Sequence, residues 1–132
     1  MFDRILLFVE DKNTPKETII WTIALARQLG SRLIAVYIVD TNALPEGKEQ
    51  LSLIEEKAWK ILYEIEDDAF EQNIKVSLLL EQGDPLEKLL TLCKSYEIQL
   101  VVLGSKSLPP LKLMERSTIP VVFVNEPRRS ND

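Results

Sequence analysis

The stretch Leu100-Val101-Val102-Leu103-Gly104-Ser105-Lys106 decides the fold. Four apolar residues followed by Gly-Ser are typical of a parallel strand that is buried on both faces and opens into a loop at its carboxyl end. Ligands of open α/β sheets bind beyond the carboxyl ends of the strands, where the strand order reverses. Gly104 lets the backbone approach a ligand closely, and the amides after it can face an anion. This turn is therefore the first candidate binding site.

The rest of the chain alternates between apolar runs and amphipathic segments. These patterns predict four further strands and three helices. The expected strands cover residues 4–9, 32–39, 74–80 and 121–124, and the expected helices cover residues 15–29, 48–72 and 86–96. Strands that alternate with helices join into a parallel sheet through right-handed crossovers. The sequence predicts a doubly wound, five-stranded α/β sheet with helices on both faces.

Two helix starts and one helix end carry local signals. Thr14-Pro15-Lys16-Glu17 predicts a threonine N-cap, proline at the first helical position and a glutamate that completes a capping box. Gly83-Asp84-Pro85 predicts a second such start, with Asp84 as the cap and Glu87 placed to close the box. Gly30 predicts a left-handed end for the first helix.

The segment between the last two strands has two interpretations. Residues 105–119 are about as long as a parallel crossover that contains a helix. Pro109-Pro110 would start that helix, and Leu111, Leu113 and Met114 would pack it on the sheet. The sequence leaves open whether residues 109–117 form this helix or an irregular loop.

Composition bounds the class of protein. The 132 residues suit one domain, expected over residues 1–126, with residues 127–132 as a flexible tail. The net charge of −5 argues against binding to nucleic acid or to anionic membranes. No apolar run approaches the ~20 residues of a membrane-spanning helix.

Residue usage also bears on chemistry and compartment. A single cysteine, Cys93, gives no disulfide framework and favours a reducing, cytoplasmic compartment. The chain has no histidine, the commonest general base and metal ligand. We therefore expect no catalytic site and no metal site.

Five motifs, in their order and spacing, resemble the universal stress protein family over nearly the whole chain. They occupy residues 5–11, 32–40, 83–85, 100–105 and 119–122. The resemblance implies the strand order 3-2-1-4-5 and a homodimer. Nucleotide-binding members of the family carry Gly-x-x-Gly, nine residues and then Gly-Ser/Thr, a motif that wraps the phosphates of ATP.

Matched to this motif, the sequence keeps one of its three glycines. Gly104 matches the first glycine, Ser107 stands in place of the second, and Ser117-Thr118 stands in place of Gly-Ser/Thr. Serine tolerates the backbone conformations of such glycines less well. Glu10 matches the family's aspartate that contacts the adenosine, and Asp40 ends the neighbouring strand. The resemblance implies a residual nucleotide site at Glu10, Asp40, Gly104, Ser105, Lys106, Ser107, Ser117 and Thr118.

Three functions are compatible with these residues. The first is a binding or interaction module without catalysis, whose ATP binding is weak or lost. The second is an ATP-binding regulatory switch that uses the same residual site. The third is a receiver-like signalling domain with Glu10-Asp11 as its acid pair, which needs an aspartate after the third strand and a lysine after the fifth. The sequence has Glu81-Gln82 and Asn125-Glu126 at those places, and this disfavours the third function.

The fifth strand predicts a partner. Val121, Val122, Phe123 and Val124 carry no charge, and the implied strand order places them at an edge of the sheet. Exposed apolar edges invite pairing and are normally protected. We expect a second copy of the chain to pair along this edge in a two-fold homodimer.

Overall fold

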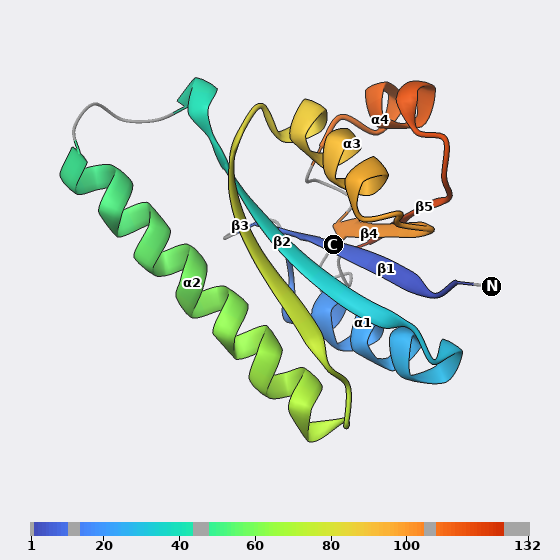
Figure 1. The fold of residues 1–132 in the computed structure, drawn as a ribbon. Coiled ribbons are helices and arrows are strands. Elements are labelled where there is room, and N and C mark those ends of the chain that lie inside the picture. Colours follow the sequence, from blue (N-terminus) through green and yellow to red (C-terminus); the bar gives the residue numbers. More distant parts are fainter. Residues whose placement is uncertain (1, 11–13, 44–47, 105–107, 126–132) are drawn as a thin grey trace, which may run out of the picture.

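A computed structural model describes residues 2–10, 14–43, 48–104 and 108–125. Five parallel strands form one sheet in the order β3-β2-β1-β4-β5, as the resemblance implies (Figure 1). The strands are β1 (Arg4–Val9), β2 (Arg32–Asp40), β3 (Val76–Gly83), β4 (Leu100–Gly104) and β5 (Val121–Val124), and the helices are α1 (Lys16–Leu29), α2 (Lys48–Glu71), α3 (Pro85–Ser95) and α4 (Pro110–Arg116), with a short 3₁₀ turn at Thr41–Ala43.

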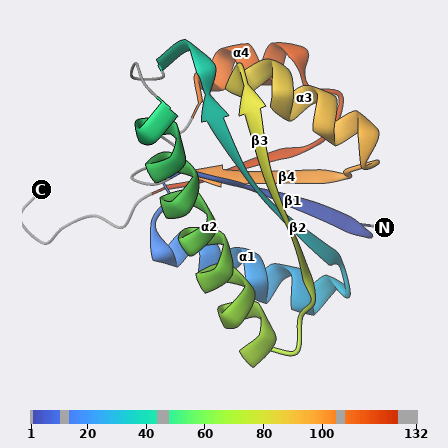
Figure 2. The same cartoon turned by 60° about the vertical axis from the view of Figure 1, so that its left-hand side comes forward.

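The sheet lies between two helical layers. Helices α1 and α2 cover one face, and α3 and α4 cover the other (Figure 2). Because successive side chains of a strand point to opposite faces, β1 contributes to both cores. Leu7 packs under α1 and α2, whereas Leu6 and Phe8 pack under α3 and α4. The prediction of a doubly wound sheet is confirmed.

The predicted central strands are buried as expected. All five residues of β4 are buried, and so are all residues of β1 except Arg4. These two strands pair directly, with Leu7 opposite Val102. Their apolar character on both faces follows from helices packing above and below them.

Two other strands are longer than the apolar runs indicate. Strand β2 extends one residue past the prediction, to Asp40, whereas β3 begins at Val76, two residues after its predicted start, and continues to Gly83. The pairing of the two strands continues past the apolar run of β3, so that Ile38 lies opposite Glu81 and Asp40 lies opposite Gly83. The pattern of apolar residues ends before the backbone pairing does.

One predicted cap is confirmed and one is wrong. The Asp84 carboxylate accepts the backbone N–H of Glu87 at 3.1 Å, as predicted. The Thr14 hydroxyl instead accepts the backbone N–H of Glu10 at 2.7 Å and thereby closes the turn after β1. The N-cap of α1 is Pro15, which has no side chain that could make a cap hydrogen bond. Gly30 ends α1 at φ +66°, in the left-handed conformation that glycine favours.

The segment after β4 contains a two-turn helix, α4. Leu113 is buried as expected, but Leu111 and Met114 are 74% and 63% exposed. The prediction that all three pack on the sheet is therefore wrong for two of them. Residues three apart share one side of a helix, and Leu113 points away from that side. A helix this short touches the sheet along one narrow line.

Candidate functional site

A pocket of about 800 Å³ lies at the carboxyl ends of β1 and β2, below α3 and α4. Its apolar lining includes Phe8 and Ile38 from the strands, Leu86 from α3 and Leu108 from the segment before α4. The volume is within the range of small-molecule sites. This is also the edge of the sheet at which open α/β proteins bind their ligands.

The rim of the pocket is predominantly acidic. Among the described residues, its carboxylates are Glu10, Asp40, Asp84, Glu87 and Glu115, and its cations are Lys112 and Arg116. Carboxylates that outnumber cations give the pocket a negative potential, which repels anions. The rim therefore favours a neutral or cationic ligand.

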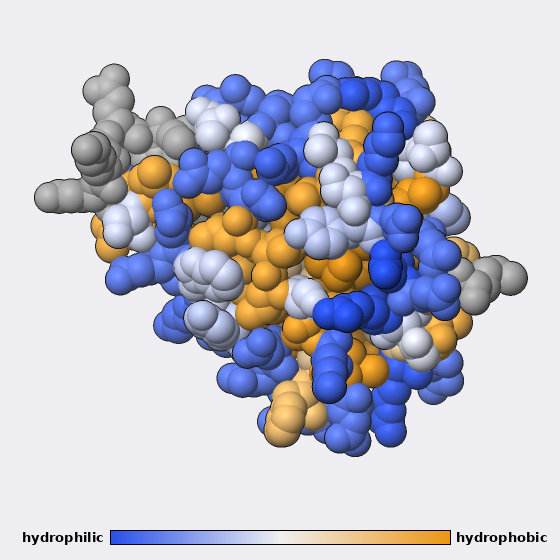
Figure 3. All heavy atoms as spheres, viewed as in Figure 1, coloured by the Kyte–Doolittle hydropathy of each residue, from blue (hydrophilic) through white to orange (hydrophobic). Residues whose placement is uncertain are grey.

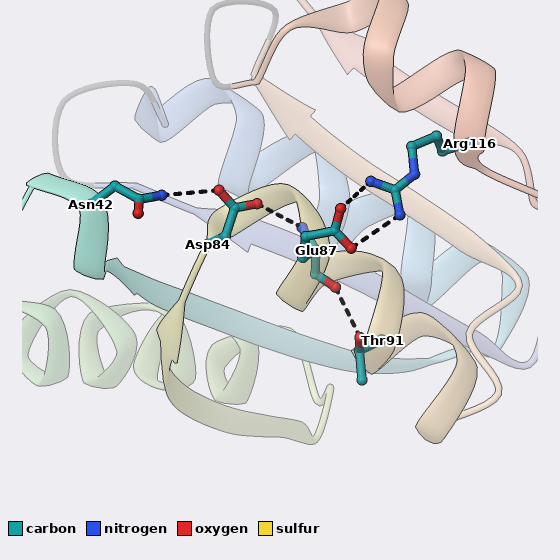
Figure 4. A network of polar contacts seen from close by, with 5 residues as sticks. All are labelled: Asn42, Asp84, Glu87, Thr91 and Arg116. Atoms are coloured by element: carbon teal, nitrogen blue, oxygen red, sulfur yellow. Dashed lines mark hydrogen bonds and ion pairs between the residues drawn. The ribbon is translucent and has the colours of Figure 1, made fainter.

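Arg116 is already engaged by a rim carboxylate. Its guanidinium donates to both carboxylate oxygens of Glu87, with a distance of 3.0 Å between Nη2 and Oε2 (Figure 4). This hydrogen bonding holds the pKa of Glu87 below its ordinary value and raises the pKa of Arg116. The bidentate pair links α3 to α4 and uses donors that could otherwise bind a phosphate.

Two other rim carboxylates have structural partners. Asp84 caps α3 and also accepts a hydrogen bond from the Asn42 side chain at 3.0 Å (Figure 4). Asp40 accepts the backbone N–H of Asn42 at 2.9 Å. Asn42 thus joins the end of β2 to the start of α3, and both carboxylates help to shape the pocket wall.

The structure brings part of the predicted site together. Glu10 and Asp40 line the pocket. Its described lining does not include Gly104, Ser117 or Thr118. Ser105, Lys106 and Ser107 lie outside the described residues.

Ser117 follows the last residue of α4 and is not part of the described pocket lining. Its hydroxyl donates to the backbone carbonyl of Ile119 at 2.8 Å and closes the turn into β5. Because β5 is parallel to β4, with Val121 opposite Val101 and Val124 opposite Gly104, this turn leads to the amino-terminal edge of the sheet. Gly104 therefore lies at the carboxyl ends of the strands, whereas the turn that begins at Ser117 leads to their amino ends.

Sequence reasoning missed the α4 side of the rim. Lys112, Glu115 and Arg116 are three and four residues apart, so they share one side of the helix. This spacing was a signal for a common polar surface. The Glu87–Arg116 pair had no such signal, because its residues are 29 positions apart.

Cys93 lies in α3 and is shielded by the core. Burial raises the pKa of its thiol from 9.0 to about 11. Because the thiolate is the nucleophile, we expect a thiol reagent at pH 8 to modify folded Cys93 far more slowly than the chain in urea. Equal rates in the two states, measured by absorbance, would contradict this account.

The same pKa predicts a dependence of stability on pH. The folded state holds the Cys93 proton more tightly than the unfolded state. The free energy of unfolding should therefore fall as the pH rises from about 9 through about 11, and a Cys93→Ser variant should lose this contribution. Urea titrations of both proteins over this pH range measure the difference.

A family model connects this fold to known proteins. The model of the universal stress protein family matches residues 1–125. The chain belongs to that family. A universal stress protein of Helicobacter pylori is 29% identical over 95 residues, which cover 67% of this chain and 69% of that protein.

Solved structures from the family share the fold. A family protein from Burkholderia pseudomallei superposes with a TM-score of 0.82 at 20% identity, over 93% of this chain and 96% of that one. A family protein from Arabidopsis thaliana with AMP bound gives 0.72 at 14% identity, over 97% and 93% of the two chains. A universal stress protein in complex with cAMP gives 0.71 at 16% identity, over 94% and 97%. Some structural relatives therefore bind nucleotides.

The described residues contain neither a membrane-spanning helix nor a metal-binding cluster. No helix among them is both long enough and apolar enough to cross a membrane. In the same part of the chain, no three or more cysteine, aspartate or glutamate side chains are grouped to hold a metal ion.

Proposed function

We propose that this chain is a homodimeric binding module without catalytic activity, whose pocket has weak or no affinity for ATP. One observation carries the proposal: among the described residues that line the pocket, five are carboxylates and two are cations. One of those cations, Arg116, is held on both arms by Glu87. A ligand of this pocket should carry less negative charge than ATP.

Charges in the pocket act on a ligand at short range. Like charges a few ångströms apart repel by several kcal/mol near a protein surface, at about 4 kcal/mol for 4 Å and an effective dielectric constant of about 20. A triphosphate carries several negative charges and needs cations or Mg²⁺ to offset them. Lys112 is the one rim cation that is not in the Glu87–Arg116 pair, among the residues described around the pocket.

A second candidate is an ATP-binding regulatory switch. Two observations favour it: the pocket volume suits a nucleotide, and two structural relatives carry AMP or cAMP. In this alternative Glu10 and Asp40 lie toward the adenosine. The resemblance assigns Gly104, Ser105, Lys106, Ser107, Ser117 and Thr118 to the phosphates, although none of them is in the described lining of the pocket.

A simple extraction separates the two candidates. The protein is purified without added nucleotide, precipitated with acid, and the supernatant is analysed by ion-exchange chromatography. The module predicts less than stoichiometric ATP in the supernatant. One ATP per chain would support the switch and contradict the proposal.

The homodimer is supported by the apolar surface at β5. All four residues of β5 are half-buried and uncharged. Val122 and Val124 pack toward the α1 side, and Val121 and Phe123 pack toward the α3 side. Helix α4 lies in the same layer as α3 (Figure 2). Its Leu111 and Met114 side chains are exposed. A second copy paired along β5 would protect the edge from other strands.

A charge on this edge should abolish the dimer. We expect Val122→Lys to convert a dimeric mass to a monomeric one in light scattering, because lysine at an edge strand opposes pairing. The control is Ile20→Lys, which places the same charge on an exposed apolar residue of α1 beside α2. Circular dichroism checks that both variants fold. A monomeric parent protein, or a dimeric Val122→Lys variant, would contradict the β5 interface.

The net charge and the cysteine content bear on the partners and the cellular location of this module. The net charge of −5 supports partners other than nucleic acid or anionic membranes. The single cysteine supports a reducing cytoplasmic location.

A further inference from the structure

The edge of the sheet at β3 is a long apolar surface. β3 is the terminal strand on this side, so its outer backbone N–H and C=O groups have no strand partner among the described residues. Residues 76–80 carry no charge and are all only half-buried. Figure 3 shows an orange hydrophobic band on this side of the molecule, between the positions of α2 and α3 in Figure 1. Such an edge is normally blunted by charge or by a cover.

An aromatic stripe on α2 (Trp59, Tyr63 and Phe70) adds to this surface. Tyr63 and Phe70 follow Trp59 by four and eleven residues, so the three side chains share one side of the helix. The rings of Trp59 and Tyr63 stack with 5.5 Å between their centroids. Tyr63 is 54% exposed and Phe70 is 80% exposed. The exposed parts of these rings offer contact area to a partner, outside the side of α2 that packs on the sheet.

The aromatic stripe runs alongside β3. Near its start, the Glu55 carboxylate accepts a hydrogen bond from the Gln82 side chain at 3.3 Å. Near its end, Phe70 lines one hollow together with Val76. Trp59 packs against the same core cluster as the inner side chains of β3. The strand edge and the aromatic stripe therefore form one continuous surface.

The charge around this surface selects the partner. In the part of α2 whose side chains are described, Glu55, Glu56, Glu64 and Asp67 surround the Trp59–Tyr63 stack, and Lys60 is the one cation beside it. At the start of β3 the charges balance, because Arg32 and Lys75 lie with Glu66 and Asp67. A second copy on this edge would bring like carboxylates together, which opposes self-pairing. A basic segment meets opposite charge, and its arginines can stack on the rings.

We propose that the β3 edge and the aromatic stripe bind an extended basic segment of another protein. The segment adds a sixth strand to the sheet through its backbone and places its cationic side chains over the stacked rings. This surface lies at the opposite edge of the sheet from β5. The inference is thus independent of both the pocket and the proposed dimer.

The test uses the full chain and synthetic peptides. A ten-residue peptide of alternating valine and arginine, with blocked ends, is titrated into a Trp21→Phe variant, in which Trp59 is the only tryptophan. We expect saturable quenching or a shift of the Trp59 emission, and slower amide hydrogen exchange at residues 78–82. A peptide with glutamate in place of arginine should not bind. Equal binding of both peptides, or no protection of β3, would overturn the proposal.

Matched variants locate the binding surface. Glu56→Lys/Glu64→Lys should weaken binding of the basic peptide at least tenfold. Glu17→Lys/Glu97→Lys makes the same change in net charge elsewhere and should leave binding within about twofold. Equal losses in the two variants would show non-specific attraction and overturn the proposal.

The aromatic residues give a second control. Tyr63→Ala/Phe70→Ser changes two exposed side chains and should also weaken peptide binding. A dimer that survives Val122→Lys but is lost in this double variant would show that a second copy occupies the edge. That result would overturn the proposal even if the pocket behaves as proposed.

Discussion

A Leu7→Ala variant is expected to lose about 3–5 kcal/mol of unfolding free energy. Leu7 is fully buried in β1, between Ala35 of β2 and Val102 of β4. Strands flank it on both sides and helices cover it, so the neighbouring side chains can fill the cavity only in part. A domain of this kind is stable by about 5–15 kcal/mol, and the loss is therefore a large share of the total.

Urea denaturation measures this effect and offers a matched control. The midpoint should fall while the slope with urea stays constant, as expected for a native-state cavity. Leu53→Ala removes the same atoms from a side chain of α2 that is 56% exposed and should change stability by less than about 0.5 kcal/mol. Equal losses in the two variants would contradict the burial of β1.

A Glu87→Gln/Glu115→Gln variant is expected to bind ATP about tenfold to a hundredfold more tightly than the parent protein. Glu87→Gln releases the Arg116 guanidinium from its bidentate partner, and Glu115→Gln removes a second carboxylate from the rim. A charge-assisted hydrogen bond to phosphate contributes about 1.5–3 kcal/mol, and each 1.4 kcal/mol changes affinity about tenfold. Calorimetric titration with ATP measures the gain.

The control for this variant makes the same change in net charge at a distance from the pocket. Glu17→Gln/Glu97→Gln removes two carboxylates that are not part of the pocket lining. It should leave ATP affinity within about twofold at physiological salt, because distant surface charges are screened. Adenosine affinity should be the same in all three proteins. An ATP affinity that does not rise in Glu87→Gln/Glu115→Gln would show that rim charge is not what limits binding.

The features that sequence reasoning predicted well are local. Four consecutive apolar residues in β4 indicate a strand covered on both faces, and the structure confirms it. Asp84 caps α3 because an acceptor before proline is a signal contained within a few residues. Gly30 ends α1 for a similar local reason.

The features that sequence reasoning missed depend on contacts between distant residues. The hydroxyl of Thr14 could cap α1 or close the turn to Glu10, and only the folded turn decides between them. The length of β3 depends on backbone pairing with β2, which extends past the apolar run. The candidate site shows the same limit. Glu10 and Asp40 could be placed at strand ends, but the pairing of Glu87 with Arg116 needs α3 and α4 side by side.

We propose that the rim of the pocket repels a triphosphate. Isothermal titration with adenosine and with ATP in Mg²⁺, at low salt, tests it most directly. We expect ATP to bind at least about tenfold more weakly than adenosine, or to give no measurable heat. Saturable binding of ATP that is tighter than that of adenosine would contradict the account.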